Sequence, residues 1–144
     1  MNRAELAQII FNNLNNNKEV LKAQFLKSKE TIGYFFIDDL LPEALALSIH
    51  EKFPTTKEAV KKKNLREFKF LAYQMDSYHP FLEEVIYAFQ DKRVIQLVSE
   101  ICELEEVYGD EHLYAGGLSL MEKDNFLNPH LDNSHDKDRS RWRV

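Results

Sequence analysis

The spacing of the apolar residues changes near residue 110, and this change limits the folds that the chain can adopt. Before it, apolar residues recur at intervals of three and four, as they do along amphipathic helices. After it, residues 112–121 contain two glycines and alternate apolar with small or polar side chains, which is typical of a strand. Helices followed by strands favour an α+β or mainly-β core with a helical buttress.

Five segments are predicted as helices. Asn2 and Asn16 each have a glutamate three residues later, which is the pattern of a capping box. Pro42 stands at the first turn of a third helix, residues 77–90 form a fourth, and Asp91 caps the fifth. We expect these apolar residues to be buried: Leu6, Ile9, Ile10 and Leu14; Val20, Leu21, Phe25 and Leu26; Leu45, Ile49 and Phe53; Phe81, Leu82, Val85, Ile86 and Phe89; Val94, Ile95, Val98 and Ile101. Those of the last two helices should pack on one face of the sheet.

The remaining segments are predicted as strands and loops. Residues 33–38 are aromatic and β-branched and indicate a buried strand, and residues 68–72 indicate another. The highly charged residues 56–67, with three lysines in succession, indicate an exposed loop. A turn should join residues 112–121 to residues 126–132 as two adjacent strands, and a third strand begins near the C-terminus.

Composition restricts the class of protein. Hydrophobic residues make up 44% of 144 residues, which suits one globular domain over residues 1–144. A net charge of −5 gives no overall attraction for nucleic acid, and no run of about 20 apolar residues predicts a membrane span. Cys102 is the single cysteine, so no internal disulfide can form, and its apolar surroundings indicate a small core residue. These features favour a cytoplasmic protein.

The segment Asn128-Pro-His-Leu-Asp132 carries the chemistry. In a strand, residues two apart project from the same face, so His130 and Asp132 would point together into one cavity. An imidazole and a carboxylate, with one distant histidine, make the 2-His-1-carboxylate triad of non-haem iron. A His-x-Asp tripeptide is a weak signal alone, since it also occurs in polar turns.

Two segments resemble the prolyl-4-hydroxylase-like branch of the 2-oxoglutarate/Fe(II)-dependent oxygenases. Tyr34–Ala46 resembles the entry strand and the Pro-started helix of that family, and Gly116–Asp132 resembles its first core strand, turn and His-x-Asp strand. The resemblance implies a double-stranded β-helix, or jelly roll. It also implies a dioxygenase that couples decarboxylation of 2-oxoglutarate to C–H hydroxylation, with Fe(II), 2-oxoglutarate and ascorbate as cofactors.

The resemblance assigns His130 and Asp132 as the first two iron ligands. The third ligand of the family is a later histidine, and a basic residue beyond it holds 2-oxoglutarate; this sequence matches neither. We therefore expect the chain to be the N-terminal part of an oxygenase domain, with helices over about 3–27, a strand- and helix-rich region over 34–104 and the first core strands over 112–144. We expect this truncated chain to turn over 2-oxoglutarate negligibly.

Two other functions are compatible with the sequence. His130, Asp132 and His135 could form a catalytic zinc site in a hydrolase, although no nearby glutamate supplies a base. Alternatively the chain is a non-catalytic scaffold or interaction module. For the oxygenase, the substrate is a small molecule or a protein side chain. The sequence identifies neither the substrate nor the oligomeric state.

Overall fold

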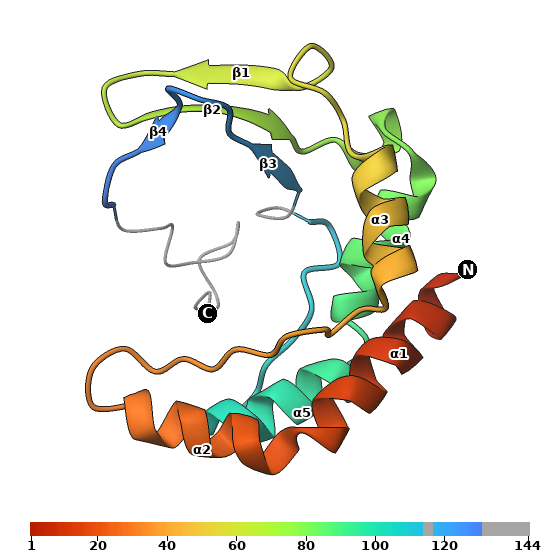
Figure 1. Ribbon diagram of the computed structural model, residues 1–144, viewed down its shortest axis with the longest axis vertical. Helices are drawn as coiled ribbons and strands as arrows, with labels where there is room; N and C mark the ends of the chain where they lie inside the picture. Colours follow the sequence, from red (N-terminus) through yellow and green to blue (C-terminus); the bar gives the residue numbers. More distant parts are fainter. Residues whose placement is uncertain (114–116, 131–144) are drawn as a thin grey trace. The chain divides into compact units, whose positions relative to one another are not determined.

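The computed structural model describes residues 1–113 and 117–130 (Figure 1). The chain divides into two compact units, Met1–Phe53 with His79–Gly109, and Pro54–Tyr78 with the residues from Asp110 onward. The first unit contains the α-helices, and the second contains an antiparallel sheet and the short 3₁₀ helix η1 (Met75–Ser77), so the predicted α+β class is confirmed. In the described part of the chain, no helix is long and apolar enough to cross a bilayer.

The helical unit contains five α-helices. They are α1 (Arg3–Asn16), α2 (Lys18–Ser28), α3 (Glu43–Lys52), α4 (Pro80–Phe89) and α5 (Lys92–Cys102). The predicted capping box at the start of α1 is confirmed, because the Asn2 side chain accepts from Glu5 N (3.0 Å) and the Glu5 carboxylate accepts from Asn2 N (2.9 Å). Asp91 caps α5 by accepting from Arg93 N at 2.9 Å.

The start of α2 differs from its prediction. The residue that precedes this helix is Asn17, and Asn16 still belongs to α1. The Asn17 side chain makes no capping bond to α2; its amide instead donates back to Asn13 O at 2.8 Å. An asparagine can bond to backbone on either side of a break, so the Asn-rich run locates the break but does not say which residue forms the cap.

The core of this unit forms between helices. α1 packs on α4 and α5, α2 on α5, and α3 on α4. The stripes of α4 and α5, predicted to pack on the sheet, are in this helical core. Val20, Leu26 and Phe89 were expected to be buried but are 60%, 45% and 41% exposed, because each helix buries only a narrow stripe. The core side chains are Leu6, Ala7, Ile10, Leu14, Leu21, Leu45, Val85, Ala88, Val94, Leu97 and Ile101.

Residues 33–38 run alongside α2 and are not part of a sheet, so the predicted strand is wrong. Their backbone bonds instead to helix side chains: Tyr34 N donates to Ser28 Oγ and Phe36 N to Gln24 Oε1, both at 2.9 Å. Gly33 lies over the ring of Phe25, where a Cβ would stand 2.7 Å from the ring. The extended conformation was correctly predicted, but α2 provides the partners that a strand would have provided.

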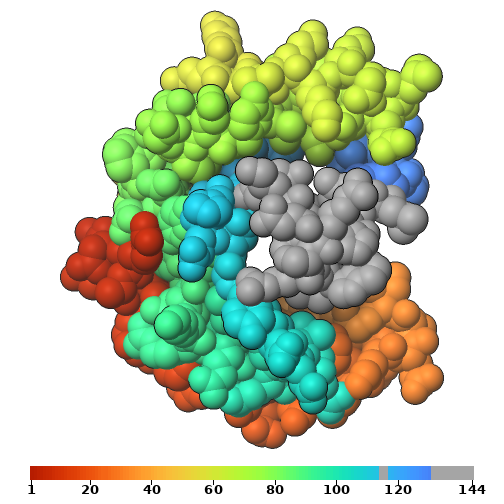
Figure 2. Space-filling view, turned by 180° about the vertical axis from the view of Figure 1, so that it is seen from behind, coloured from red at the N-terminus to blue at the C-terminus, as the bar shows by residue number. Residues whose placement is uncertain are grey.

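In the second unit β2 (Glu67–Ala72) is the central strand. β1 (Val60–Lys63) pairs with it antiparallel, with Lys62 opposite Lys69. β1 falls within the segment predicted as an exposed loop, so its residues are exposed as predicted, but they form a strand and not a loop. All four residues of β1 are exposed, as charged residues of an edge strand can be. A run of charged residues therefore does not distinguish an exposed edge strand from a loop. Figure 2 shows the side chains of this hairpin at the surface, in yellow and yellow-green.

β3 (Leu118–Leu120) and β4 (Phe126–Leu127) both pair antiparallel with β2, each along a different part of it. They were predicted to pair with each other. The turn between them exists, and in it the Asn125 side chain accepts from Glu122 N at 2.9 Å. However, the turn makes an excursion and returns the chain to the same edge of β2. The cause is the apolar pairing, since Leu120 lies opposite Phe70 and Phe126 opposite Phe68.

Gly117 precedes β3 where two backbones approach closely. Its φ is +136°, and a Cβ there would stand 2.8 Å from the carbonyl oxygen of Ala72. Both features require glycine. The close approach predicted for the glycine pair is therefore confirmed at Gly117, whereas Gly116 lies outside the described residues.

Glu67 connects the two strands of the hairpin. Its side chain is 9% exposed and accepts from Lys62 Nζ at 2.7 Å and from Lys69 Nζ at 2.8 Å. Two lysines directly opposite each other would repel, and the carboxylate between them offsets that repulsion. The hydrogen bonds from Lys62 and then Lys69 lower the pKa of Glu67 from 4.5 to about 2.

Replacement of Ile101 by alanine should destabilise the helical unit. Ile101 is fully buried, so Ile101→Ala should lower the free energy of unfolding by about 2–5 kcal/mol in a denaturant titration. Phe89→Ala is the control, because its larger side chain is 41% exposed and should cost clearly less. Equal losses in the two variants would mean that the core is wrongly placed.

Acid should weaken the hairpin through Glu67. Because its pKa is about 2 when folded and near 4.5 when unfolded, the stabilisation is present above pH 4.5 and disappears as the pH falls toward 2. An NMR titration of the Glu67 carboxyl measures the folded pKa, and Glu67→Gln should remove this part of the acid sensitivity. A midpoint close to 4.5 would show that the two lysines do not hold the carboxylate.

Candidate metal centre

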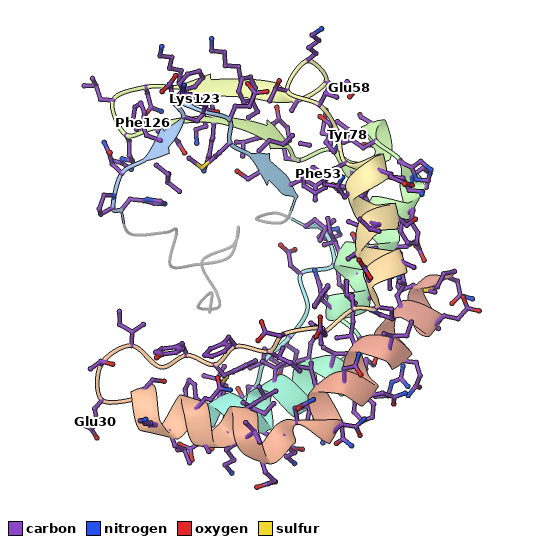
Figure 3. All side chains as sticks on the ribbon, in the orientation of Figure 1. Glu30, Phe53, Glu58, Tyr78, Lys123 and Phe126 are labelled. Atoms are coloured by element: carbon purple, nitrogen blue, oxygen red, sulfur yellow. The ribbon has the colours of Figure 1, made fainter. Side chains whose placement is uncertain are left out.

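The chain that leaves β4 is attached to the turn between β1 and β2. Asn128 N donates to Arg66 O at 2.9 Å, and the Asn128 side-chain amide donates to Leu65 O at 3.0 Å. Figure 3 labels Phe126 in β4, and Asn128 and His130 follow this residue in the sequence. The two bonds of Asn128 therefore fix the backbone just before the first candidate ligand.

The turn between β1 and β2 is itself held by hydrogen bonds to an asparagine side chain. The Asn64 side chain accepts from Arg66 N at 2.7 Å and from Glu67 N at 3.0 Å, as in an Asx turn. Neither Asn64 nor Asn128 was recognised as a positioning residue in the sequence. For Asn64 the signal was available, because an asparagine between two extended segments is a turn residue. For Asn128 there was none, since its partners are more than sixty residues away.

His130 is exposed and follows Pro129. β4 ends at Leu127, so the predicted strand over 126–132 is confirmed only at its start. Pro129 has no N–H to give to a ladder, which explains why regular pairing does not continue. The His130 side chain is therefore presented from an irregular segment close to the end of a strand.

One contact of His130 defines which ring nitrogen can bind a metal. Its Nδ1 lies 2.8 Å from the carbonyl oxygen of Asn128. A carbonyl oxygen only accepts, so Nδ1 must carry the hydrogen, and in the neutral ring Nε2 then carries the lone pair. Histidine ligands of metals commonly donate their other ring N–H to a backbone carbonyl in this way. The arrangement suits metal binding through Nε2.

The predicted partner ligand cannot be placed beside it. Asp132 lies outside the described residues, as does His135, so their position relative to His130 stays a prediction. Within residues 1–113 and 117–130, no group of three histidine, cysteine, aspartate or glutamate side chains could hold a metal. Of the other histidines, His79 caps α4, because its Nδ1 accepts from Phe81 N at 3.2 Å.

Cys102 is a structural residue. It is half-buried at the end of α5 and packs against the helical core, and burial raises the pKa of its thiol. A raised pKa leaves less of the nucleophilic thiolate at neutral pH. The prediction of a small core residue is confirmed in part, because Cys102 lies at the margin of the core.

Comparison of this chain with protein-family models, with curated proteins and with solved structures finds no match in any of the three.

The tautomer of His130 can be tested directly. ¹⁵N NMR of the imidazole ring at a pH where it is neutral should show hydrogen on Nδ1, because the Asn128 carbonyl accepts it. His112, which is exposed in the same unit, serves as the reference histidine. Predominant hydrogen on Nε2 of His130 would contradict the proposed orientation of the ring.

Proposed function

We propose that this chain carries part of the iron site of a 2-oxoglutarate- and Fe(II)-dependent dioxygenase. The reaction couples decarboxylation of 2-oxoglutarate to succinate with hydroxylation of a C–H bond. The observation that carries the proposal is the His130 contact, in which Nδ1–H of an exposed ring faces the carbonyl oxygen of Asn128. The resemblance of Tyr34–Ala46 and Gly116–Asp132 to the oxygenase family supplies the reaction class.

His130 and Asp132 would hold the metal. A neutral imidazole and a carboxylate are two of the three donors in the facial triad of non-haem iron. Bound iron would supply the open positions at which 2-oxoglutarate and oxygen meet. The contribution of the chain is orientation: Asn128 fixes the backbone to Leu65 and Arg66, and its carbonyl sets the His130 ring.

The double-stranded β-helix belongs to the same proposal. It is supported by the antiparallel sheet, in which β3 and β4 follow one edge of β2 and the chain then continues to the ligand segment. A jelly roll consists of such antiparallel strands, and its inward-facing residues line the site. The proposed substrate is a small molecule or a protein side chain.

Metal binding distinguishes this function from the alternatives. Under anaerobic conditions, His130→Ala and Asp132→Ala should each weaken Mn(II) binding at least about tenfold, because each removes one of few ligands. Free Mn(II) is measured by electron paramagnetic resonance, with and without 2-oxoglutarate. His112→Ala, an exposed histidine of the same unit, is the matched control and should bind as the unchanged chain does.

A third variant, His135→Ala, separates the iron site from a zinc site. Only the zinc reading uses His135 as a ligand, so loss of Zn(II) binding in this variant would favour the hydrolase. Metal affinity that no variant alters would favour the non-catalytic module. The protein expressed from its complete gene should form succinate from 2-oxoglutarate only with Fe(II), and both ligand variants should abolish this. Iron-independent or unaltered succinate formation would contradict the assignment.

A further inference from the structure

Hydrogen bonds within residues 1–113 and 117–130 use one of the two backbone edges of the extended segment Gly33–Ile37. Tyr34 N donates to Ser28 Oγ and Phe36 N to Gln24 Oε1, and the Tyr34 carbonyl lies 2.9 Å from the same Ser28 hydroxyl. In an extended chain, the N–H and C=O groups of alternate residues point to opposite edges. The backbone N–H and C=O groups of the even-numbered residues therefore point toward α2. Figure 1 shows the segment as the orange trace that runs along that helix.

The backbone N–H and C=O groups of the odd-numbered residues point toward the other edge of the segment. In the part of the chain that the structure describes, no hydrogen bond reaches the backbone N–H or C=O of Gly33, Phe35 or Ile37. Six main-chain groups are thus arranged along one open edge. Such an edge is a template for pairing with another extended chain.

The side chains of the segment alternate as they do in a strand that covers a core. Phe35 and Ile37 are half-buried and pack against the helical core. Ile32, Tyr34 and Phe36 are 78%, 56% and 63% exposed. A strand that added to the open edge would extend this two-faced surface, and it would gain both a hydrogen-bond ladder and exposed aromatic neighbours.

We propose that the segment pairs antiparallel with the same segment of a second copy of this chain, centred on Phe35. Phe35 then exchanges both backbone hydrogen bonds with Phe35 of the second copy, and Gly33 and Ile37 of each copy exchange theirs with Ile37 and Gly33 of the other. All six groups of the open edge are paired on each copy. The contact is self-complementary, as a two-fold dimer interface must be.

Other registers do not satisfy the same groups. A ladder centred on Gly33 would recruit residues 29–31, which form the turn that follows α2. A ladder centred on Ile37 would recruit Asp39, whose φ of 54° is not extended. Only the register on Phe35 pairs all six groups of the open edge without recruiting a residue outside Gly33–Ile37, so it is the one that we propose.

This register brings the exposed aromatic residues together. Tyr34 of each copy lies opposite Phe36 of the other in a non-hydrogen-bonded pair, the closer kind of cross-strand neighbour. Two such pairs form, one on each side of the axis. They explain why both residues can be aromatic and yet remain exposed within one copy. A contact of two short strands is small, so the dimer should be weak and its population should depend on concentration.

The test exploits the cross-strand pairs. In Tyr34→Lys/Phe36→Lys each pair becomes lysine against lysine, and in Tyr34→Lys/Phe36→Glu each becomes lysine against glutamate. Sedimentation velocity over micromolar to millimolar protein should show a monomer–dimer equilibrium for the unchanged chain, loss of the dimer in the first variant and its return in the second. Leu47→Lys on α3, also exposed in this unit at 55%, is the control and should dimerise normally.

Three outcomes would overturn the proposal. The unchanged chain could stay monomeric throughout the concentration range. The lysine–lysine variant could still dimerise, which would exclude this segment from the contact. The lysine–glutamate variant could stay monomeric, which would exclude the register on Phe35. Circular dichroism of every variant checks that the helical unit is folded, since neither substituted residue belongs to its core.

Discussion

Antiparallel pairing along β2 is the interaction on which the sheet unit depends. β1 occupies one edge of β2, and β3 and β4 occupy successive parts of the other. Each partner strand is four residues long or shorter, so none would be stable alone. β2 also contains Glu67, whose carboxylate holds lysines of both hairpin strands, and β2 begins directly after the turn that receives Asn128. The position of His130 therefore follows from β2.

The helical unit obtains its stability differently, by burying narrow apolar stripes between helices. Its extended segment shows how a chain can be straight without belonging to a sheet. Ser28 and Gln24 of α2 accept the N–H groups of Tyr34 and Phe36, and burial of Phe35 adds an apolar contact. Because two side chains replace one strand, hydrogen bonds from the described residues satisfy one backbone edge of this segment. The other edge keeps its N–H and C=O groups for a further partner because side chains, and not a strand, bond to the segment.

At the candidate metal centre, backbone position and ring orientation have separate causes. The two hydrogen bonds of Asn128 to Leu65 and Arg66 fix the backbone, and Pro129 ends the regular pairing. The Asn128 carbonyl then sets the tautomer of His130. One asparagine thus connects the pairing of β2 with the orientation of the His130 ring. Neither effect depends on the chemistry that the site performs.

The sequence by itself determined the features that arise from local physics. The capping box at Asn2, the cap at Asp91 and the helical stripes around Leu6 and Val94 all depend on residues near in the chain. The positive φ of Gly117 is a property of its own backbone. His130 was predicted as a metal ligand by its type and spacing, and that role stays a prediction. The tertiary structure decided which partner each segment received. Residues 33–38 bond to a helix, Val60–Lys63 form an edge strand despite their charge, and β3 and β4 pair with β2 because Leu120 and Phe126 meet Phe70 and Phe68 there. Those choices join residues far apart in the chain, and local patterns carry no information about them.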